Sequence, residues 1–236
     1  MNAAANQAPA QRPLPRERAQ HIADAFLPRH PLGSRYHYYY VRTKLRSDPL
    51  YPGVCAALAG TRAPLLDLGC GLGLLAHALR QEQIDMPYHG VDLDRRKIDA
   101  ACHGADRAGL ANVEFDTLDL AAALPAHRGS VAILDVLQYL GAERQAELLD
   151  TAIGMLEPGA RLVIRAALDG GGGRTRITVA TDRIAQWLGW MQATPRHYPA
   201  EAQLRAQLDA AGLRSRFSPL AGNTPFNHWL IVAERD

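Results

Sequence analysis

Short apolar runs alternate with helix-patterned segments between residues 65 and 166 of this 236-residue chain, and this alternation constrains the fold most strongly. The runs have the length and composition of buried strands, and the segments between most of them carry apolar residues at helical spacing. Strands joined by crossover helices form a parallel sheet covered on both faces, so we predict a doubly wound α/β core. The runs are residues 65–69, 88–93, 113–118, 131–137 and 160–166.

The segment before this core predicts a tail and a helical cap. Residues 1–16 are rich in Ala, Gln and Pro and almost lack large apolar side chains, so we expect a disordered tail. Apolar spacing predicts helices at Arg16 to Leu27, Tyr36 to Arg46 and Tyr51 to Leu58. Residues 17–60 are therefore interpreted as an N-terminal helical cap.

Residues 61–236 are interpreted as the α/β domain, with an insertion at about 170–198. The insertion begins with a tetraglycine and contains a helix-patterned segment from Asp182 to Met191. After it we predict a helix from Pro199 to Ala211 and two closing strands, residues 213–220 and 228–235.

Composition argues against several classes of protein. No segment approaches the roughly 18 apolar residues that span a bilayer, and the N-terminus lacks a signal-peptide core, so we expect a cytoplasmic protein without membrane insertion. Cys55, Cys70 and Cys102 show neither disulfide nor zinc spacing, and we expect no metal. A net charge of +2 without a basic run disfavours nucleic acid as a partner.

A glycine-rich turn follows the first predicted strand. Residues 67–73 read D-L-G-C-G-L-G, and the following segment has a helical pattern. Glycines let the backbone approach a ligand, and the helix N-terminus offers free N–H groups. The dinucleotide fingerprint would need glycine at position 74, where Leu74 stands, so a nicotinamide oxidoreductase is the less favoured alternative.

The D-x-G-x-G-x-G pattern resembles motif I of class I S-adenosylmethionine (SAM) dependent methyltransferases, in which Asp67 would face the cationic amino-acid part of the cofactor. Asp92 and Asp119 resemble the acidic residues that follow the next two strands and accept from ribose hydroxyls and adenine. Residues 156–164 resemble the turn into the fifth strand, with Ala160 in place of its second glycine. Taken singly, Asp92 could merely end a strand, Asp119 cap a short helix and Gly159 form a turn.

The resemblance implies a seven-stranded, mostly parallel sheet with an antiparallel last strand, SAM as cofactor and S-adenosylhomocysteine (SAH) as product. A non-catalytic SAM-binding scaffold remains an alternative. The cofactor-binding residues that the resemblance implies are Asp67, Gly69, Cys70, Gly71, Gly73, Asp92, Leu93, Asp119, Leu120, Asp135 and Lys44.

The segment after the fourth strand, Asp135 to Leu140, bears on the methyl acceptor. It lacks the N/D-P-P-Y/F turn of amino-methylating enzymes and the Pro-Cys pair of cytosine enzymes, and is similar to the turn of small-molecule methyltransferases. The stretch Lys44 to Pro49 together with residues 90–98 resembles, more weakly, small methyltransferases of bacterial aryl polyene pigment clusters. That resemblance implies a phenolic or aryl-polyene acceptor, free or carrier-bound, methylated on oxygen or carbon.

Two variable segments are candidates to cover the acceptor. The Tyr-rich helix is either a lid over the site or an amphipathic helix packed on the sheet. The segment after the tetraglycine is either a movable cover or core. We predict His197 and Tyr40 as catalytic candidates. Substrate-binding candidates are Tyr39, Trp187, Met191 and His228.

Overall fold

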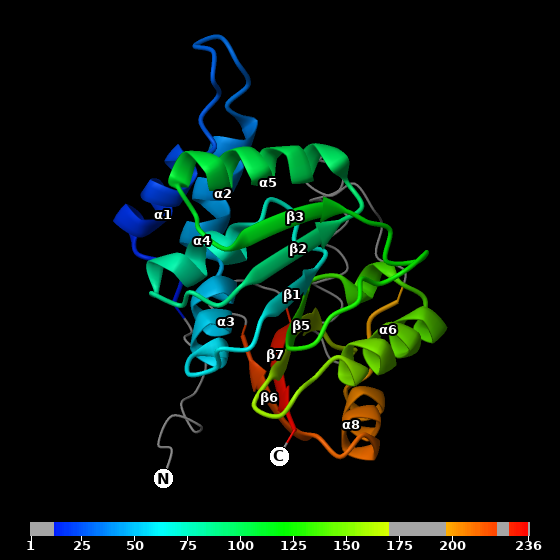
Figure 1. The fold of residues 1–236 in the computed structure, drawn as a ribbon. Helices are drawn as coiled ribbons and strands as arrows, with labels where there is room; N and C mark the ends of the chain where they lie inside the picture. Colours follow the sequence, from blue (N-terminus) through cyan, green and yellow to red (C-terminus); the bar gives the residue numbers. More distant parts are fainter. Residues whose placement is uncertain (1–11, 170–196, 221–226, 236) are drawn as a thin grey trace.

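The computed structural model describes residues 12–169, 197–220 and 227–235. Within them, seven strands form one sheet in the order β3-β2-β1-β4-β5-β7-β6, and β7 runs antiparallel to both neighbours (Figure 1). The predicted fold, a doubly wound and mostly parallel sheet with an antiparallel last strand, is confirmed. The strands are β1 (Leu65–Leu68), β2 (Tyr88–Asp92), β3 (Val113–Thr117), β4 (Ser130–Leu134), β5 (Arg161–Ala167), β6 (Arg214–Pro219) and β7 (His228–Glu234).

Helices cover both faces of the sheet (Figure 1). The first three helices pack with α4 and α5 on one face, which we call the cap face, while α6 and α8 cover the other. The helices are α1 (Arg16–Asp24), α2 (Tyr36–Ser47), α3 (Leu50–Leu58), α4 (Leu74–Gln81), α5 (Arg95–Ala108), α6 (Ala142–Gly154) and α8 (Glu201–Ala210), with a 3₁₀ turn at Leu137–Tyr139.

Successive side chains of a strand point to opposite faces, which decides where its polar residues lie. On β1, Leu65 joins the hydrophobic cluster of the cap face, and Leu66 joins the cluster of the other face. Asp67 therefore points toward the cap. On β5, Val163 belongs to the cap-face cluster, so Arg165 also points toward the cap.

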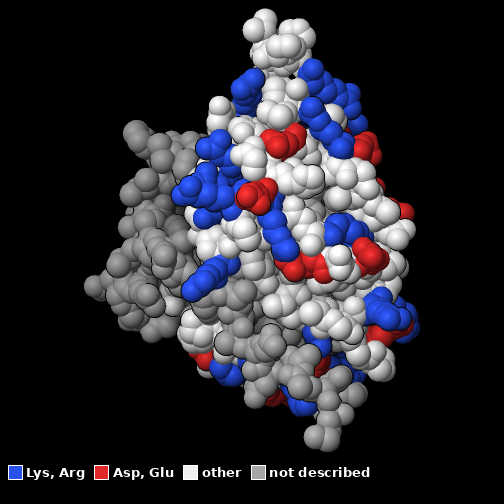
Figure 2. All heavy atoms as spheres, turned by 90° about the vertical axis from the view of Figure 1, so that its left-hand side faces the viewer, with Lys and Arg blue, Asp and Glu red and all other residues white. Residues whose placement is uncertain are grey.

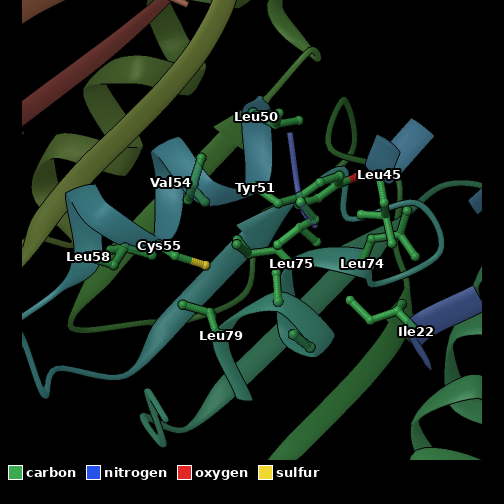
Figure 3. Packing of buried hydrophobic residues seen from close by; sticks show 14 of the residues in the cluster. Ile22, Leu45, Leu50, Tyr51, Val54, Cys55, Leu58, Leu74, Leu75 and Leu79 are labelled. Carbon is green, nitrogen blue, oxygen red and sulfur yellow. The ribbon is translucent and has the colours of Figure 1, made fainter. Parts of the chain in front are cut away.

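The cap belongs to the same hydrophobic core as the sheet. Figure 3 shows Ile22 of α1, Leu45 of α2 and Leu75 of α4 within one cluster of buried side chains. Leu14 lies inside the predicted tail, yet it is only 6% exposed and its N–H donates to the Leu45 carbonyl at 3.1 Å. The packed part of the chain thus begins earlier than the tail boundary at residue 16 predicted.

One predicted helix ends earlier in the structure, because the helix predicted through Leu27 ends at Asp24. The fourth strand ends at Leu134, directly before the segment from Asp135 to Leu140, although its apolar run continues to Leu137. Asp135 adopts a left-handed backbone with φ of 60°, and a 3₁₀ turn follows. The helix predicted at 182–191 lies outside the described residues.

We predict opposite signs for one substitution at two helical glycines. A Cβ at Gly104 of α5 would lie 2.8 Å from the buried Phe26 ring, whereas a Cβ at Gly154 of α6 meets no described atom within 4 Å. Gly154→Ala should raise the free energy of unfolding by about 0.5–1 kcal/mol through helix propensity. Gly104→Ala should lower it by about 1–3 kcal/mol through overpacking. Urea denaturation measures both, and stabilisation by both would contradict this packing of the cap on α5.

Candidate active site

The glycine loop between β1 and α4 has three glycines with positive φ, and each meets a different environment. A Cβ on Gly69 would lie 2.4 Å from Val136 Cγ2, and a Cβ on Gly73 would lie 2.4 Å from the Phe115 ring. A Cβ on Gly71, where φ is 58°, would meet no described atom within 4 Å. Gly69 and Gly73 are therefore required by packing within the protein, whereas the space beside Gly71 is open among the described residues.

Asp92 at the end of β2 holds the glycine loop in place. Its Oδ2 accepts from the Gly71 N–H at 2.9 Å, and its Oδ1 accepts from the Asp94 N–H at 2.9 Å. The N–H groups of Gly69 and Cys70 both donate to the Val91 carbonyl. The carboxylate predicted to bind a ribose thus lies directly beside the exposed backbone of Gly71.

Asp67 is a buried carboxylate on the cap face of β1. Asp67 is only 2% exposed, and its Oδ2 accepts from the Tyr88 hydroxyl at 2.6 Å. Its Oδ1 has no hydrogen-bond partner among the described residues. Burial raises the pKa of Asp67 to about 7, against the lowering effect of the Tyr88 hydrogen bond. A cationic donor would satisfy the second oxygen and offset the cost of burying the charge.

Three of the predicted cofactor-binding residues, Leu93, Asp119 and Leu120, follow the ends of β2 and β3. Leu93 is 66% exposed, Leu120 is half-buried, and Asp119 is exposed. Asp119 Oδ1 accepts from the Ala121 N–H at 2.8 Å, so this carboxylate caps a local turn. A contact between Asp119 and adenine stays a prediction.

A buried polar cluster joins the cap to the carboxyl end of β4. Arg165 of β5 is only 2% exposed, and its guanidinium contacts Asp48, Asp135 and His228. The Asp48 carboxylate also accepts from Lys44 of α2 at 2.8 Å, and Lys44 Nζ lies 3.7 Å from Asp135 Oδ2. We call these five residues the Arg165 cluster.

Charges within the Arg165 cluster balance. Burial alone raises the pKa of Asp48 and lowers that of Lys44, but the opposite charges outweigh burial and keep both groups ionised. The two cations, Lys44 and Arg165, thus face the carboxylates of Asp48 and Asp135. Burial and the neighbouring Arg165 lower the pKa of His228 to about 3. His228 is therefore neutral, and its Nδ1 accepts from Arg165 Nη2 at 2.6 Å, which leaves the ring proton on Nε2.

The predicted residues of α2 separate onto two sides of the helix. Tyr40 is half-buried, stacks on Tyr36 with ring centroids 6.3 Å apart, and lies near Lys44. Tyr39 is 51% exposed and packs edge-on against Tyr38. The structure thus brings Tyr40 and Lys44 together at the Arg165 cluster and places Tyr39 on the outer side.

Figure 2 shows acidic and basic side chains interspersed on the face of the molecule that lies to the left in Figure 1.

His197 reaches the site through its backbone. Its N–H donates to the Gln138 carbonyl at 3.2 Å, and its carbonyl accepts from Gln145 Nε2 at 2.9 Å. This places residue 197 beside the turn after β4, with an exposed side chain. Trp187 and Met191 lie outside the described residues.

Within the described ranges, no group of three or more His, Cys, Asp or Glu side chains is placed to hold a metal ion. Over the same ranges, no helix has the length and apolarity to cross a bilayer.

Sequence reasoning missed Arg165, Asp48 and Tyr88. A signal for Arg165 was present, because this arginine interrupts the apolar run that follows Arg161 in β5, and a charge in such a position must be paired. Its partners could not be identified in the same way, because Asp48 lies 117 residues away in the chain.

A family profile described as a methyltransferase domain matches residues 16–216. The chain belongs to the class I SAM-dependent methyltransferases. No curated protein matches the sequence.

Solved methyltransferases share the fold at low sequence identity. Magnesium protoporphyrin IX methyltransferase (ChlM) from Synechocystis PCC 6803, solved with bound SAH, has a TM-score of 0.62 and 18% identity over 93% of this chain and 94% of its own. The pyocyanin biosynthetic protein PhzM has a TM-score of 0.64 and 15% identity over 87% of this chain and 60% of its own. The neocarzinostatin O-methyltransferase NcsB1, in complex with SAH and 1,4-dihydroxy-2-naphthoic acid, has a TM-score of 0.57 and 18% identity over 84% and 56%.

We predict that Gly71→Val abolishes cofactor binding in a folded methyltransferase. A side chain at this position would occupy the space beside the exposed backbone, which should weaken SAH binding by about 100-fold or more in calorimetry. Gly159→Val is the matched control, because Gly159 also has positive φ and open space but precedes β5 at the other end of the sheet. Both variants should lose about 1–3 kcal/mol of stability to backbone strain. Normal SAH binding by Gly71→Val would remove the loop from the site.

Proposed function

We propose that this methyltransferase transfers the methyl group of SAM to a small, partly hydrophobic acceptor of the aromatic or phenolic class, on oxygen or carbon. The observation that carries the proposal is the row of ligand groups along the carboxyl edge of β1, β2 and β4. Among the described residues, Asp67 has a buried oxygen without a hydrogen-bond partner, the space beside Gly71 is open, and Asp135 lies at the tip of β4.

These residues fit the parts of SAM. The carboxylate of Asp67 would hold the ammonium group, and Asp92 would accept from the ribose hydroxyls while it keeps Gly71 in place. Exposed Leu93 and half-buried Leu120 would pack on adenine, with Asp119 at its edge. Cys70, Gly69 and Gly73 would form the rest of the cradle. When bound, SAM supplies a methyl group that its sulfonium has already activated.

Helix α2 would cover this row of groups. His37 near the start of the helix interacts electrostatically with Asp94, and Lys44 near its end contacts Asp135. The rise of an α-helix makes these two residues about 10 Å apart along the axis. The helix would therefore extend from the loop after β2, where the ribose would bind, to the end of β4. Tyr40 lies between His37 and Lys44 on this helix, where it would meet an acceptor.

The chemistry required of the protein is alignment and exclusion of water, because displacement at an activated methyl group needs an in-line nucleophile. A base is needed only for an acceptor that must lose a proton. His228 does not supply one, because Nδ1 is occupied by Arg165 and its pKa is about 3. His197 and Tyr40 remain the catalytic candidates.

Two of the structural neighbours support an aromatic acceptor. One is named for magnesium protoporphyrin IX, and another was solved with 1,4-dihydroxy-2-naphthoic acid, both of which are planar ring systems. Phenolic and aryl-polyene precursors, free or attached to a carrier, belong to the same chemical class.

Labelled product formation tests the function. The protein is incubated with methyl-labelled SAM and a panel of phenols, naphthols and aryl-polyene acids, free and carrier-bound, and products are identified by mass spectrometry. We expect transfer to at least one planar aromatic acceptor and none with Gly71→Val. Binding of SAH without turnover of any acceptor would support the non-catalytic scaffold, and preferential binding of NAD would contradict the proposal.

The buried carboxylate of Asp67 predicts a pH dependence of cofactor binding. Its pKa is raised to about 7, so it becomes neutral at lower pH and loses its attraction for an ammonium group. SAH affinity should fall by up to about tenfold per pH unit below the pKa and level off above it. Tyr88→Phe removes a hydrogen bond to the charged form and should move the midpoint to higher pH.

Tyr38→Phe is the control for Tyr88→Phe, because the Tyr38 hydroxyl accepts from Gln20 at 3.0 Å on the cap. It should leave the midpoint unchanged. Calorimetric titrations across the pH range give both midpoints. A flat profile between pH values on either side of the Asp67 pKa would separate Asp67 from the ammonium site.

A further inference from the structure

Arg165 lies where a sheet normally carries an apolar side chain. It pairs in register with Leu134 of β4 and Leu230 of β7 and is 2% exposed. Removing a guanidinium from water costs several kcal/mol unless its partners are well placed. The identity of those partners therefore indicates what the buried charge does.

The guanidinium joins three segments that are distant in sequence. Nη1 lies 3.1 Å from Asp48 Oδ2, between α2 and α3, and also contacts Asp135 Oδ2 after β4. Nη2 donates to Asp48 Oδ1 at 3.2 Å and to His228 Nδ1 at 2.6 Å. A planar fork with several donors can make these contacts at once, and a single ammonium cannot.

Arg165 holds Asp135 in an unusual backbone conformation. The Asp135 N–H donates to the Arg165 carbonyl at 2.9 Å, and its carboxylate accepts from the Arg165 guanidinium. The next residue, Val136, contacts the position where Gly69 lacks a Cβ. The turn after β4 is thus fixed against the glycine loop by a residue of β5.

The same guanidinium holds the cap. Asp48 accepts from Lys44 at 2.8 Å and from the Leu50 N–H at 3.0 Å, so it joins the end of α2 to the start of α3. Lys44 Nζ also lies 3.7 Å from Asp135 Oδ2. Arg165, Asp48, Lys44 and Asp135 therefore form a closed circuit of alternating charge.

We propose that Arg165 is a positioning residue that couples the cap to the donor end of the cofactor site, by holding Asp135 against the glycine loop and Asp48 beneath α2. Here the donor end is the part of the cofactor site beside Asp135 and the turn after β4. The inference rests on the proposed function, because that function assigns a cofactor to this part of the protein. Arg165 acts through these two carboxylates and not by contact with the cofactor.

Arg161 provides a matched control on the same strand and face. It donates to the carbonyls of Ala57 and Ala59 at the end of α3, and it lies 3.4 Å from Glu234 of β7. Like Arg165, it ties the cap to β5 and β7. It does so at the opposite end of the strand, where no predicted site residue lies.

The test compares Arg165→Lys with Arg161→Lys by calorimetry with SAH, well below both thermal transitions. Arg165→Lys should weaken SAH binding about tenfold, and Arg161→Lys by less than about twofold, whichever loses more stability. In an Asp135→Asn background, Arg165→Lys should cost less than about threefold, because it acts through Asp135. The inference would be overturned if the two lysine variants lost SAH affinity equally. It would also be overturned if Arg165→Lys still weakened SAH binding about tenfold in the Asp135→Asn background.

Asp48→Asn tests the coupling from the cap if Arg165→Lys does not fold. It keeps an acceptor for Arg165 but removes the charge that holds Lys44, so SAH binding should weaken about fivefold. Unchanged affinity would overturn the inference. Absence of SAH binding by the unaltered protein would instead contradict the proposed function, so the two failures are distinct.

Discussion

A buried positive charge on β5 is the constraint on which the site depends. Arg165 cannot remain in the interior without compensating charge, and the chain supplies it from the cap through Asp48 and from the end of β4 through Asp135. The requirement for pairing thus fixes the relation between α2, the turn after β4 and the glycine loop. A network of this kind is sensitive, because the loss of one member leaves the others buried and unpaired.

The alternation of side chains along the strands explains why one face of the sheet carries the polar chemistry. Asp67, Arg165 and His228 all point toward the cap, whereas Leu66, Ile164 and Ile231 of the same strands fill the core under α6 and α8. The second face is an apolar support for the sheet. The first combines an apolar centre with polar groups toward the carboxyl edge, where α2 can cover a ligand.

The fold and the glycine loop could be predicted from sequence because their signals are local. Alternating strand and helix patterns predicted the sheet. The spacing of Asp67, Gly71 and Asp92 indicated the glycine loop, in which the structure shows a hydrogen bond from the Gly71 N–H to Asp92. The separate roles of the glycines were not predictable, because Val136 and Phe115 meet them only in three dimensions. The Arg165 cluster was missed for the same reason. The left-handed backbone of Asp135 was not predictable either, because Asp135 and Arg165 meet only in three dimensions.

We infer that the cap and the carboxyl edge of the sheet form one cofactor site. Hydrogen exchange with and without SAH tests it directly. We expect slower exchange in residues 36–47 together with the glycine loop and the turn after β4, with α6 and α8 unchanged. Protection of the glycine loop without any change in residues 36–47 would contradict the claim and leave the Tyr-rich helix as packing alone.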